Sequence, residues 1–324
     1  MDNRDINLKD AGLIVTVTFN PALDESLSVA ELIPDKKLKC SQPVCGPGGG
    51  GINVARAVKK LGGDALAIYL AGGDSGKKIH HLLSKETIWS IAIKTTESTR
   101  INLVVSDLAN KKQYLLDMPG NKVSKEEWQA CLSTITEMAD VKYIVASGSL
   151  PPGVPVDVFA KIALIAKQKN ALLIVDTSGE ALKKAIEGGV YLIKPNIREL
   201  AALVGETELD IASVPNAARQ VINNGNCEVV VVSMGPYGAY LVTKELAIKI
   251  TPPVLAVKST VGAGDSMVAG IVLSLANNKS LTEAVRYGVA CGSAATINYG
   301  TQLCSKADAD EICKSVILKN HVEI

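Results

Sequence analysis

The chain has 324 residues, 47% of them apolar, so it can bury one large core and a small appendage. Its formal net charge is +1, which gives no basic field for nucleic acid and no acidic tail. No uninterrupted apolar run approaches the roughly 20 residues that a membrane helix needs. We therefore expect a cytoplasmic protein whose partners include neither nucleic acid nor a membrane.

Runs rich in β-branched residues alternate along the chain with segments of helical periodicity. Strands are predicted at 13–18, 65–70, 143–146, 172–176, 191–193 and 229–233. Helices are predicted near 52–61, 76–85, 124–138, 156–169, 197–204, 213–223, 265–276, 281–297 and 306–318. Such alternation predicts an α/β fold with a mostly parallel, doubly wound sheet and helices on both faces.

Two segments interrupt this alternation, at about 25–45 and 88–118. Within the second, residues 101–106 and 113–117 flank a turn at Asn110-Lys111. Neither segment has an intervening helical pattern, so both are expected to form antiparallel strands of a separate small sheet. The chain is otherwise expected to be a single domain over 1–324.

Four consecutive glycines lie in the segment G-P-G-G-G-G-I-N at 46–53, which opens a predicted helix. Glycines are costly to order and have no side chain to pack, so we expect the backbone to approach a ligand closely here. The same segment contains G-x-G-x-x-G, the pattern of nicotinamide dehydrogenases. That pattern is poorly placed, because residues 39–44 before it do not read as a buried parallel strand.

The segment K-P-N-I-R-E at 194–199 follows a short apolar strand and opens a helix. Asn196 and Glu199 are three residues apart and share one face of its first turn. They could orient a metal ion and its waters, or they could form an N-cap with a capping-box acid. The spacing alone does not separate the two interpretations.

A glycine-rich turn in S-T-V-G-A-G-D-S-M-V-A-G at 259–270 delivers Asp265 to the first turn of an apolar helix. Gly262 and Gly264 allow several N–H groups to point at one spot, and the helix macrodipole adds partial positive charge there. A carboxylate beside an anion hole is what a kinase needs when a hydroxyl attacks a γ-phosphate. The alternative is an aspartate that only caps the helix.

In this order, the motifs resemble those of the ribokinase-like (PfkB) sugar kinase family, and the resemblance covers nearly the whole chain. Its markers are N-P-A-L-D at 20–24, G-G-G-G-I-N-V-A-R at 48–56, T-R-I-N-L at 99–103, S-G-S-L-P-P-G at 147–153, K-P-N-x-x-E at 194–199, S-M-G-P-Y-G at 233–238 and G-A-G-D at 262–265. Within the family, the sequences of these motifs are most similar to those of the isozyme-2 type of 6-phosphofructokinase. 1-Phosphofructokinases usually carry a Lys within the first glycine run, where this chain has Gly.

The resemblance implies ATP-dependent phosphorylation of a ketohexose phosphate, with fructose 6-phosphate as the first expectation. Tagatose-6-phosphate kinase and 1-phosphofructokinase are the alternatives, and a non-catalytic sugar-phosphate sensor on the same fold is another. By resemblance, Asp265 is the base, and Gly262, Ala263 and Gly264 form the anion hole. The implied sugar contacts are Asp24, Lys37, Gly49, Gly50, Asn53, Arg100 and Ser149. Arg100 and Lys37 would bind the phosphate that the acceptor already carries.

From the residues alone, Asp24 could equally be a turn residue, and the two cations could be solvated surface groups. The implied ATP contacts are Lys194, Asn196, Ser233, Met234, Gly235 and Gly238. Glu199 would help to organise Mg²⁺ through water. A K⁺ site is implied at Ser259, Val261, Ala295, Asn298, Gly300 and Gln302, chiefly through carbonyl oxygens. The small sheet would be a lid over the sugar and the surface of a homodimer.

Overall fold

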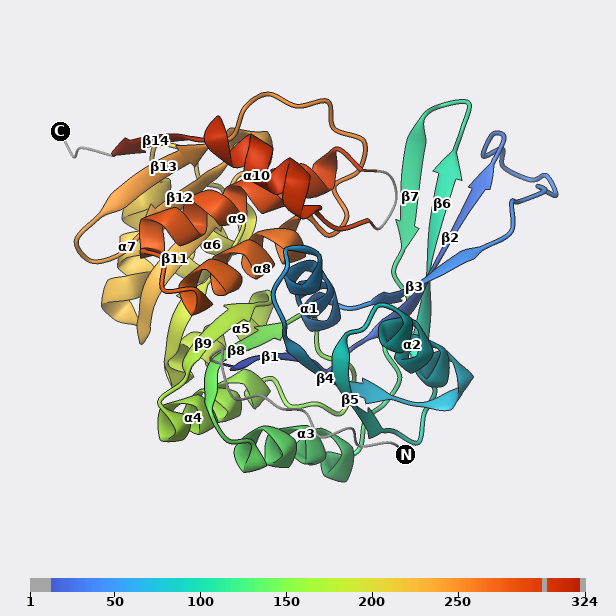
Figure 1. Ribbon diagram of the computed structural model, residues 1–324, viewed down its shortest axis with the longest axis horizontal. Helices are drawn as coiled ribbons and strands as arrows, with labels where there is room; N and C mark the ends of the chain where they lie inside the picture. The colour runs from blue at the N-terminus through green and yellow to red at the C-terminus, as the bar shows by residue number, and fades with distance from the viewer. Residues whose placement is uncertain (1–12, 299–301, 321–324) are drawn as a thin grey trace.

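The computed structural model describes residues 13–298 and 302–320, which form an α/β fold around one large sheet (Figure 1). Within these residues, ten strands have the order β14-β13-β12-β11-β10-β9-β8-β1-β4-β5. Their bounds are β1 (Leu13–Thr18), β4 (Leu66–Ala71), β5 (Trp89–Lys94), β8 (Val141–Ser147), β9 (Leu172–Asp176), β10 (Val190–Ile193), β11 (Cys227–Ser233), β12 (Ala239–Val242), β13 (Ala247–Thr251) and β14 (Ile317–Asn320). The predicted fold class is confirmed.

All neighbouring strands from β5 to β11 pair in parallel, and β12, β13 and β14 extend the sheet with antiparallel pairs. The parallel strands read as continuous apolar runs, such as V-V-V-V in β11, because helices cover them on both faces. In β1, Val15 lies opposite Leu66 on one side and Ile144 on the other. The three antiparallel strands were not predicted.

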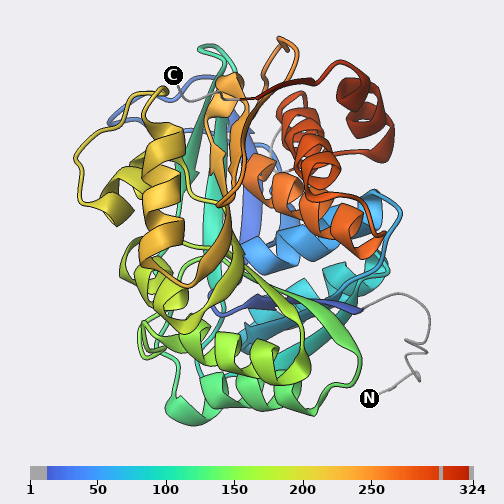
Figure 2. The same cartoon turned by 90° about the vertical axis from the view of Figure 1, so that its left-hand side faces the viewer.

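Helices cover both faces of the large sheet, which gives a three-layered molecule (Figures 1 and 2). One core cluster lies between the sheet and α1, α2, α8, α9 and α10, and the other between the sheet and α3 to α7. The helix bounds are α1 (Gly50–Lys60), α2 (Gly73–Lys85), α3 (Lys125–Glu137), α4 (Val158–Lys169), α5 (Gly179–Gly188), α6 (Ile197–Val204), α7 (Val214–Asn224), α8 (Ala263–Ala276), α9 (Leu281–Thr296) and α10 (Lys306–Lys314).

A small sheet projects from one end of the molecule, at the upper right of Figure 1. Its four strands have the order β3-β2-β6-β7, with bounds β2 (Ala22–Val29), β3 (Val44–Gly48), β6 (Arg100–Asp107) and β7 (Lys112–Leu116). The outer pairs are antiparallel as expected. The central pair of β2 with β6 is parallel, because both strands start at the large sheet and run outward.

Very short connections join the small sheet to the large one. Three residues, 19–21, separate β1 from β2, and Gly49 alone separates β3 from α1. Gly49 has a φ of 112°, in the region that L side chains rarely adopt, which explains why glycine is needed at this turn. We refer to residues 19–21 and Gly49 as the junction.

Three elements differ from the sequence-based expectations. β5 was expected in the small sheet, within 88–118, but it pairs in parallel with β4 at the edge of the large sheet. Helix α5 was not predicted, although its buried Leu182, Ala185 and Ile186 have helical spacing. The helix expected at 306–318 ends at Lys314, and β14 begins three residues later.

Candidate active site

The parallel strands deliver several polar side chains to one edge of the large sheet. Ser149 follows β8, Asp176 ends β9, Lys194 follows β10 and Ser233 ends β11. In open α/β sheets, the carboxyl ends of the strands are where ligands bind. A hollow at this edge is lined by Gly50, Ser147, Gly148, Ser149, Asp176, Thr177, Ser178, Glu199 and Asp265. It brings predicted sugar-side and nucleotide-side residues together.

The turn before α8 places Asp265 three residues after the N-cap. Gly262 is that N-cap, and its φ of 72° is left-handed. A Cβ on Gly262 would also lie 2.7 Å from Leu303 Cδ2, so the leucine side chain would have to move as well. The first N–H groups of a helix lack intrahelical acceptors, and with the macrodipole they make this end of α8 attractive to an anion.

The Asp265 carboxylate accepts a hydrogen bond from Asn53 Nδ2 at 3.0 Å. Burial and the nearby Asp176 carboxylate raise the pKa of Asp265 to about 7, while Asn53 and Lys194 act in the opposite direction. A carboxyl group with a pKa near neutrality is suited to general-base work, because it is both substantially ionised and able to hold a proton at the operating pH.

Asp24 lies on β2, on the side of the site that faces the small sheet. Its Oδ1 accepts a hydrogen bond from Asn102 Nδ2 at 3.1 Å. Burial raises the pKa of Asp24, and the Asn102 bond and the charges of Arg100 and Arg56 oppose that rise. A Cβ on Gly48 of the adjacent strand would lie 2.2 Å from Asp24 Oδ2, so Gly48 makes room for this carboxylate.

The glycine run was expected to lie close to a ligand, but three of its glycines lie close to atoms of the protein itself. A Cβ on Gly49 would lie 2.8 Å from Thr18 Cγ2, and one on Gly50 would lie 2.3 Å from Ser147 Oγ. A Cβ on Gly51 would lie 2.7 Å from the Val17 carbonyl oxygen. The run therefore lets α1 approach β1 and β8. Gly50 alone of these three lines the hollow.

Arg100 begins β6, and its guanidinium is held inside the protein. Nη1 donates to Asp117 Oδ1 and to the Met118 carbonyl, both at 2.6 Å, and Nη2 donates to the Asn20 carbonyl at 3.1 Å. The side chain is only 9% exposed, and its Nε has no hydrogen-bond partner among the described residues. Arg100 is therefore no solvated surface cation, and its Nε is a buried donor without a partner among the described residues.

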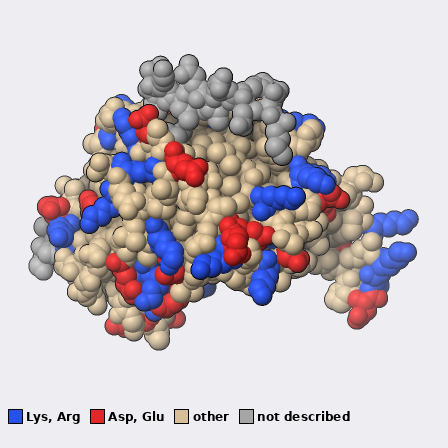
Figure 3. Space-filling model, turned by 90° about the horizontal axis from the view of Figure 1, so that it is seen from below, with Lys and Arg blue, Asp and Glu red and all other residues tan. Residues whose placement is uncertain are grey.

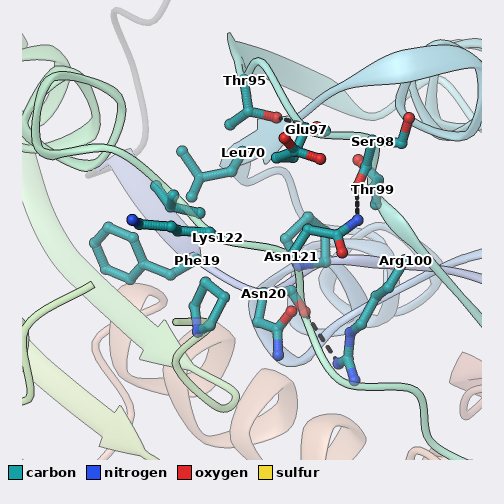
Figure 4. A pocket seen from close by; sticks show the side chains of 13 residues that line it. Phe19, Asn20, Leu70, Thr95, Glu97, Ser98, Thr99, Arg100, Asn121 and Lys122 are labelled. Atoms are coloured by element: carbon teal, nitrogen blue, oxygen red, sulfur yellow. Dashed lines mark hydrogen bonds between the residues drawn. The ribbon is translucent and has the colours of Figure 1, made fainter. Parts of the chain in front are cut away.

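Arg100 also lines a narrow pocket beside the junction, where it points toward Asn20 (Figure 4). This pocket shares no lining residue with the hollow that contains Asp265. Asn20 extends its side chain toward Ser149, donating from Nδ2 to Oγ at 2.9 Å. Lys37 lies in the exposed loop between β2 and β3, and within the described residues no hydrogen bond or ion pair holds it.

Lys194 is 9% exposed at its side chain and pairs with Asp176, with 3.2 Å between Nζ and Oδ1. Burial alone would lower the pKa of Lys194, but Asp176, Asp265 and Glu199 outweigh it and the pKa is raised. A Cβ on Gly264 would lie 3.2 Å from Nζ, so the ammonium group reaches the first turn of α8. A fixed positive charge therefore lies beside the predicted anion hole.

Asn196 and Glu199 form a capping box at the start of α6. The Glu199 N–H donates to Asn196 Oδ1 at 2.9 Å, and the Asn196 N–H donates to Glu199 Oε2 at 2.8 Å. Of the two interpretations that the spacing left open, the capping box is therefore the one that the structure shows. Glu199 also lines the hollow, so its second carboxylate oxygen is close to the site.

The segment after β11 turns back sharply toward β12. Ser233 donates its N–H to the Pro195 carbonyl at 2.9 Å, which ties it to the Lys194 segment. The Met234 N–H donates to the Gly238 carbonyl at 2.8 Å across a short 3₁₀ helix, Gly235–Tyr237. Gly238 has a φ of 86°, and a Cβ there would lie 2.0 Å from the Ile250 carbonyl oxygen.

The residues of the expected K⁺ site come from two segments that touch. The Ser259 N–H donates to the Thr296 carbonyl at 3.2 Å, and Ser259 Oγ accepts from the Val261 N–H at 3.2 Å. Ser259 Oγ also bonds Gln113 of β7 at 3.2 Å. The Ala295 carbonyl accepts from Asn298 at 3.2 Å. Gln302 is exposed, and Gly300 lies outside the described residues.

Three residues with a place in this geometry were missed from the sequence: Asp176, Asn102 and Arg56. Asp176 ends an apolar strand run, L-L-I-V-D, and the rule that ligands bind at carboxyl ends could have identified it. Asn102 lies within T-R-I-N-L and Arg56 within N-V-A-R, but nothing local shows that either points at a site carboxylate or its partner. The dehydrogenase pattern is excluded, because β3 before Gly49 lies in the small sheet and pairs antiparallel with β2.

Among the helices of residues 13–298 and 302–320, none has the length and apolar character that a membrane span requires. Over the same residues, His, Cys, Asp and Glu form no group of three that could hold a metal ion. The face in Figure 3 carries Lys and Arg interspersed with Asp and Glu, in keeping with the balanced net charge.

Comparison with known proteins adds three findings. A family model for pfkB family carbohydrate kinases matches residues 17–308. The ATP-dependent 6-phosphofructokinase isozyme 2 of Escherichia coli (strain K12) is 44% identical over 300 residues, which are 92% of this chain and 97% of that protein. Crystal structures of phosphofructokinase-2 from Escherichia coli match with a TM-score of 0.90 in complex with potassium and 0.89 in complex with fructose-6-phosphate. Their identities are 43% and 41%, and each match covers 94% of this chain and 98% of the other.

Proposed function

The chain belongs to the pfkB family of carbohydrate kinases, and on this premise we propose that it transfers the γ-phosphoryl group of ATP to fructose 6-phosphate, giving fructose 1,6-bisphosphate. The observation that carries the proposal is the placement of Asp265. Its carboxylate, with a pKa of about 7, lies in the first turn of α8 between Asn53 on the sugar side and Lys194 on the nucleotide side. The 44% identity to a 6-phosphofructokinase supports the choice of acceptor.

Asp265 accepts the proton of the attacking sugar hydroxyl as its oxygen bonds the γ-phosphorus and the bond to the β-phosphate oxygen breaks. The N–H groups of Ala263 and Gly264 at the start of α8 stabilise the charge on the transferred group, for which the Ala263 N–H gives up a long bond of 3.4 Å to the Thr260 carbonyl. Lys194 adds a positive charge next to the same turn, where Gly264 leaves room for its ammonium group. Asp265 in the first turn of α8 thus takes the hydroxyl proton, and the N–H groups of that turn together with Lys194 stabilise the charge on the phosphoryl group.

The sugar binds between the small sheet and α1. Asp24 and Asn53 bind hydroxyl groups of the sugar. The backbone at Gly49 and Gly50 lies along the sugar ring, and Ser149 contacts the end of the sugar away from them. Arg100 binds the phosphate that the sugar already carries through Nη1, once Asp117 gives way. Asp117 is 69% exposed, so this exchange replaces one solvated carboxylate by an anion that remains in place. Lys37 joins when its loop closes over the sugar.

ATP binds along the segment from Lys194 to Asn196 and the turn from Ser233 to Gly238. Mg²⁺ neutralises charge on the transferred phosphates when it is bound. The donor set suits this ion: the carboxylate of Glu199 borders the hollow and has one oxygen outside its capping box. Mg²⁺ keeps most of its waters in such sites, so a single carboxylate that acts through water is sufficient.

K⁺ binds behind the α8 turn. The proposal is supported by the contact between the two segments that carry Ser259, Val261, Ala295 and Asn298, since the Ser259 N–H bonds the Thr296 carbonyl. Carbonyl and hydroxyl oxygens are the ligands that a hard cation takes. Because Val261 immediately precedes the Gly262 cap, an ion here fixes the turn that carries Asp265. Gln302 contributes its main-chain oxygen.

The small sheet is a lid over the sugar and the contact surface of a homodimer. Its strands and turns expose several apolar side chains, among them Ile101, Tyr114, Leu115, Leu116 and Met118, each between 39% and 54% exposed. Helix α2 packs against β2 and β3, but the exposed side chains above show that the rest of the sheet does not bury both faces, so a second copy of the chain is the economical cover.

A coupled assay of ADP release tests the proposed function. Fructose 6-phosphate, tagatose 6-phosphate, fructose 1-phosphate, fructose and ribose are compared at equal concentration, with Mg²⁺ and K⁺ present. We expect the highest kcat/KM with fructose 6-phosphate. A preference for tagatose 6-phosphate or fructose 1-phosphate would reassign the acceptor within the family, and no ADP release with any of the five sugars would contradict the proposal.

A further inference from the structure

Asn53 contacts Asp265 directly, so whatever fixes the Asn53 amide also fixes the hydrogen bond that reaches the catalytic carboxylate. An asparagine amide can be turned over to exchange its oxygen and its NH₂ group. Only one of the two orientations donates to Asp265. The other would place an oxygen atom against a carboxylate, which repels it.

Arg56 lies one helical turn after Asn53 on α1 and faces the same amide. Its Nη1 donates to Asn53 Oδ1 at 3.4 Å. A guanidinium group has donors and no acceptor, so the atom that faces it must be the amide oxygen. The Asn53 NH₂ group then points at Asp265, as the 3.0 Å bond shows.

Arg56 is itself clamped from the other side by Glu86. Nε and Nη2 donate to the two Glu86 oxygens at 2.8 and 2.7 Å, the bidentate arrangement that fits a guanidinium to a carboxylate. Nη1 also donates to the Pro47 carbonyl of β3 at 2.9 Å. The Arg56 side chain is only 11% exposed, so the clamp is largely shielded from solvent. Glu86 lies just past the end of α2, outside the hollow.

We propose that Arg56, clamped by Glu86, is a positioning residue that holds the Asn53 amide with its NH₂ group toward Asp265. Glu86, Arg56, Asn53 and Asp265 then form one chain of hydrogen bonds from α2 through α1 to α8. This inference rests on the proposed role of Asp265 in phosphoryl transfer and adds residues to it that touch neither substrate nor the reacting atoms.

Glu86→Ala gives the sharpest test, because a pure charge effect and a loss of Asn53 orientation would shift the pKa of Asp265 in opposite directions. Through charge alone, removal of a carboxylate lowers the pKa of Asp265. Through orientation, loss of the clamp frees the Asn53 amide, removes a bond to the ionised form and raises that pKa. The other charged groups around Asp265, namely Asp24, Asp176, Lys194 and Glu199, are unchanged by the substitution.

The pKa is measured by ¹³C NMR on protein with labelled aspartate carboxyls, with no ligand present and with Asp265→Asn for assignment. We expect Glu86→Ala to raise the pKa of Asp265 by about one unit, as loss of one bond to a charged group allows. Arg56→Lys keeps the charge but loses the fork, and it should raise the pKa as well. A downward shift in Glu86→Ala, or no shift in either variant, would overturn the inference.

Asp64→Ala is the matched control. Asp64 pairs at 2.7 Å with Lys59, which lies on α1 like Arg56 but on the exposed side of the helix. It should leave the pKa of Asp265 unchanged while it removes an ion pair from α1. In the kinase assay, Glu86→Ala should lower kcat about tenfold and leave the KM for ATP unchanged, as a misplaced catalytic group does. Since the NMR measurement needs no substrate, it decides on the positioning role even if the proposed acceptor is wrong.

Discussion

Lys194 Nζ lies 3.2 Å from Asp176 Oδ1, at the carboxyl ends of two neighbouring parallel strands, and both groups are largely buried. This ion pair holds the lysine against the first turn of α8, where Gly264 leaves room for its ammonium group and where we propose that the transferred phosphoryl group gathers charge. Removal of the lysine should therefore lower turnover.

Lys194→Met should lower kcat/KM for ATP by roughly 10- to 150-fold, since a charge-assisted bond contributes about 1.5–3 kcal/mol. The variant also leaves Asp176 buried without its partner, so thermal unfolding is followed in parallel. Lys184→Met removes a lysine that pairs with Glu187 on the surface and serves as the control. Equal kinetics for Lys194→Met and Lys184→Met would place the lysine outside the catalytic site.

Asp265→Asn should lower kcat by roughly 10²-fold or more while both substrates still bind, because general-base catalysis contributes about 10²–10⁴. Binding is measured by calorimetry and turnover by ADP release. Asp308→Asn is the matched control, since Asp308 occupies the same position three residues after the N-cap of α10. Near-normal turnover of Asp265→Asn would remove this residue from the mechanism.

The raised pKa of Asp265 makes the wild-type protein less stable as the pH rises from about 4 to about 7. An acid whose pKa is 3.8 when unfolded and about 7 when folded loses folded-state stability over that interval. Asp265→Asn should therefore unfold at a higher denaturant concentration than the wild type at pH 8, and the difference should be smaller at pH 4. Over the same range, kcat of the wild type should rise with pH. A stability difference that is equal at both pH values would contradict the shifted pKa.

Arg100→Ala should cost roughly 10- to 150-fold in kcat/KM for the sugar phosphate and hardly change the KM for ATP, on the same energetic scale. Free fructose carries no phosphate, so its poorer phosphorylation should be affected far less. Because Arg100 also binds the Asn20 and Met118 carbonyls, a drop in melting temperature is expected as well. Equal kinetic losses on both sugars would mean that Arg100 only supports the lid, and Lys37 would then be the next candidate.

Leu115→Glu on β7 should shift the protein from dimer to monomer in size-exclusion chromatography with light scattering, because it places a charge in the proposed contact. Leu115 is 54% exposed. Leu164→Glu on α4 changes a leucine that is 59% exposed on the far side of the large sheet, and should leave the mass unchanged. A dimer that survives Leu115→Glu would place the contact elsewhere.

The parallel core could be predicted from the sequence because helices cover it on both faces, which leaves long apolar runs at β1, β8 and β11. The antiparallel strands β12 to β14 could not, since four- and five-residue runs near a sheet edge carry little periodic signal. β5 was placed in the wrong sheet for the same reason. Its residues are all exposed or half-buried, unlike the buried runs of the central parallel strands, and only its pairing with β4 places it in the large sheet.

In the site, motifs identified the residues that follow strands or open helices, such as Asp265 and Lys194. They could not show which neighbours orient them. Asn102 and Arg56 act across elements that are distant in sequence, and such contacts arise only when the chain folds. The same limit affected the glycine run: sequence shows that side chains are excluded there, but not whether a ligand or a strand excludes them.

The junction lies close to the proposed sugar contacts and far from the outer end of the small sheet. Asp24 lies three residues from Pro21, whereas the exposed loop around Lys37 lies at the far end of the same sheet. A rotation about residues 19–21 and Gly49 therefore moves Asp24 by a small fraction of the distance that it moves the loop. Arg100 binds the Asn20 carbonyl at the pivot itself. If the small sheet acts as the proposed lid, its rotation would leave the proposed sugar contacts Asp24 and Arg100 nearly in place, and the proposed partner subunit on the outer strands would move the loop much farther than the site.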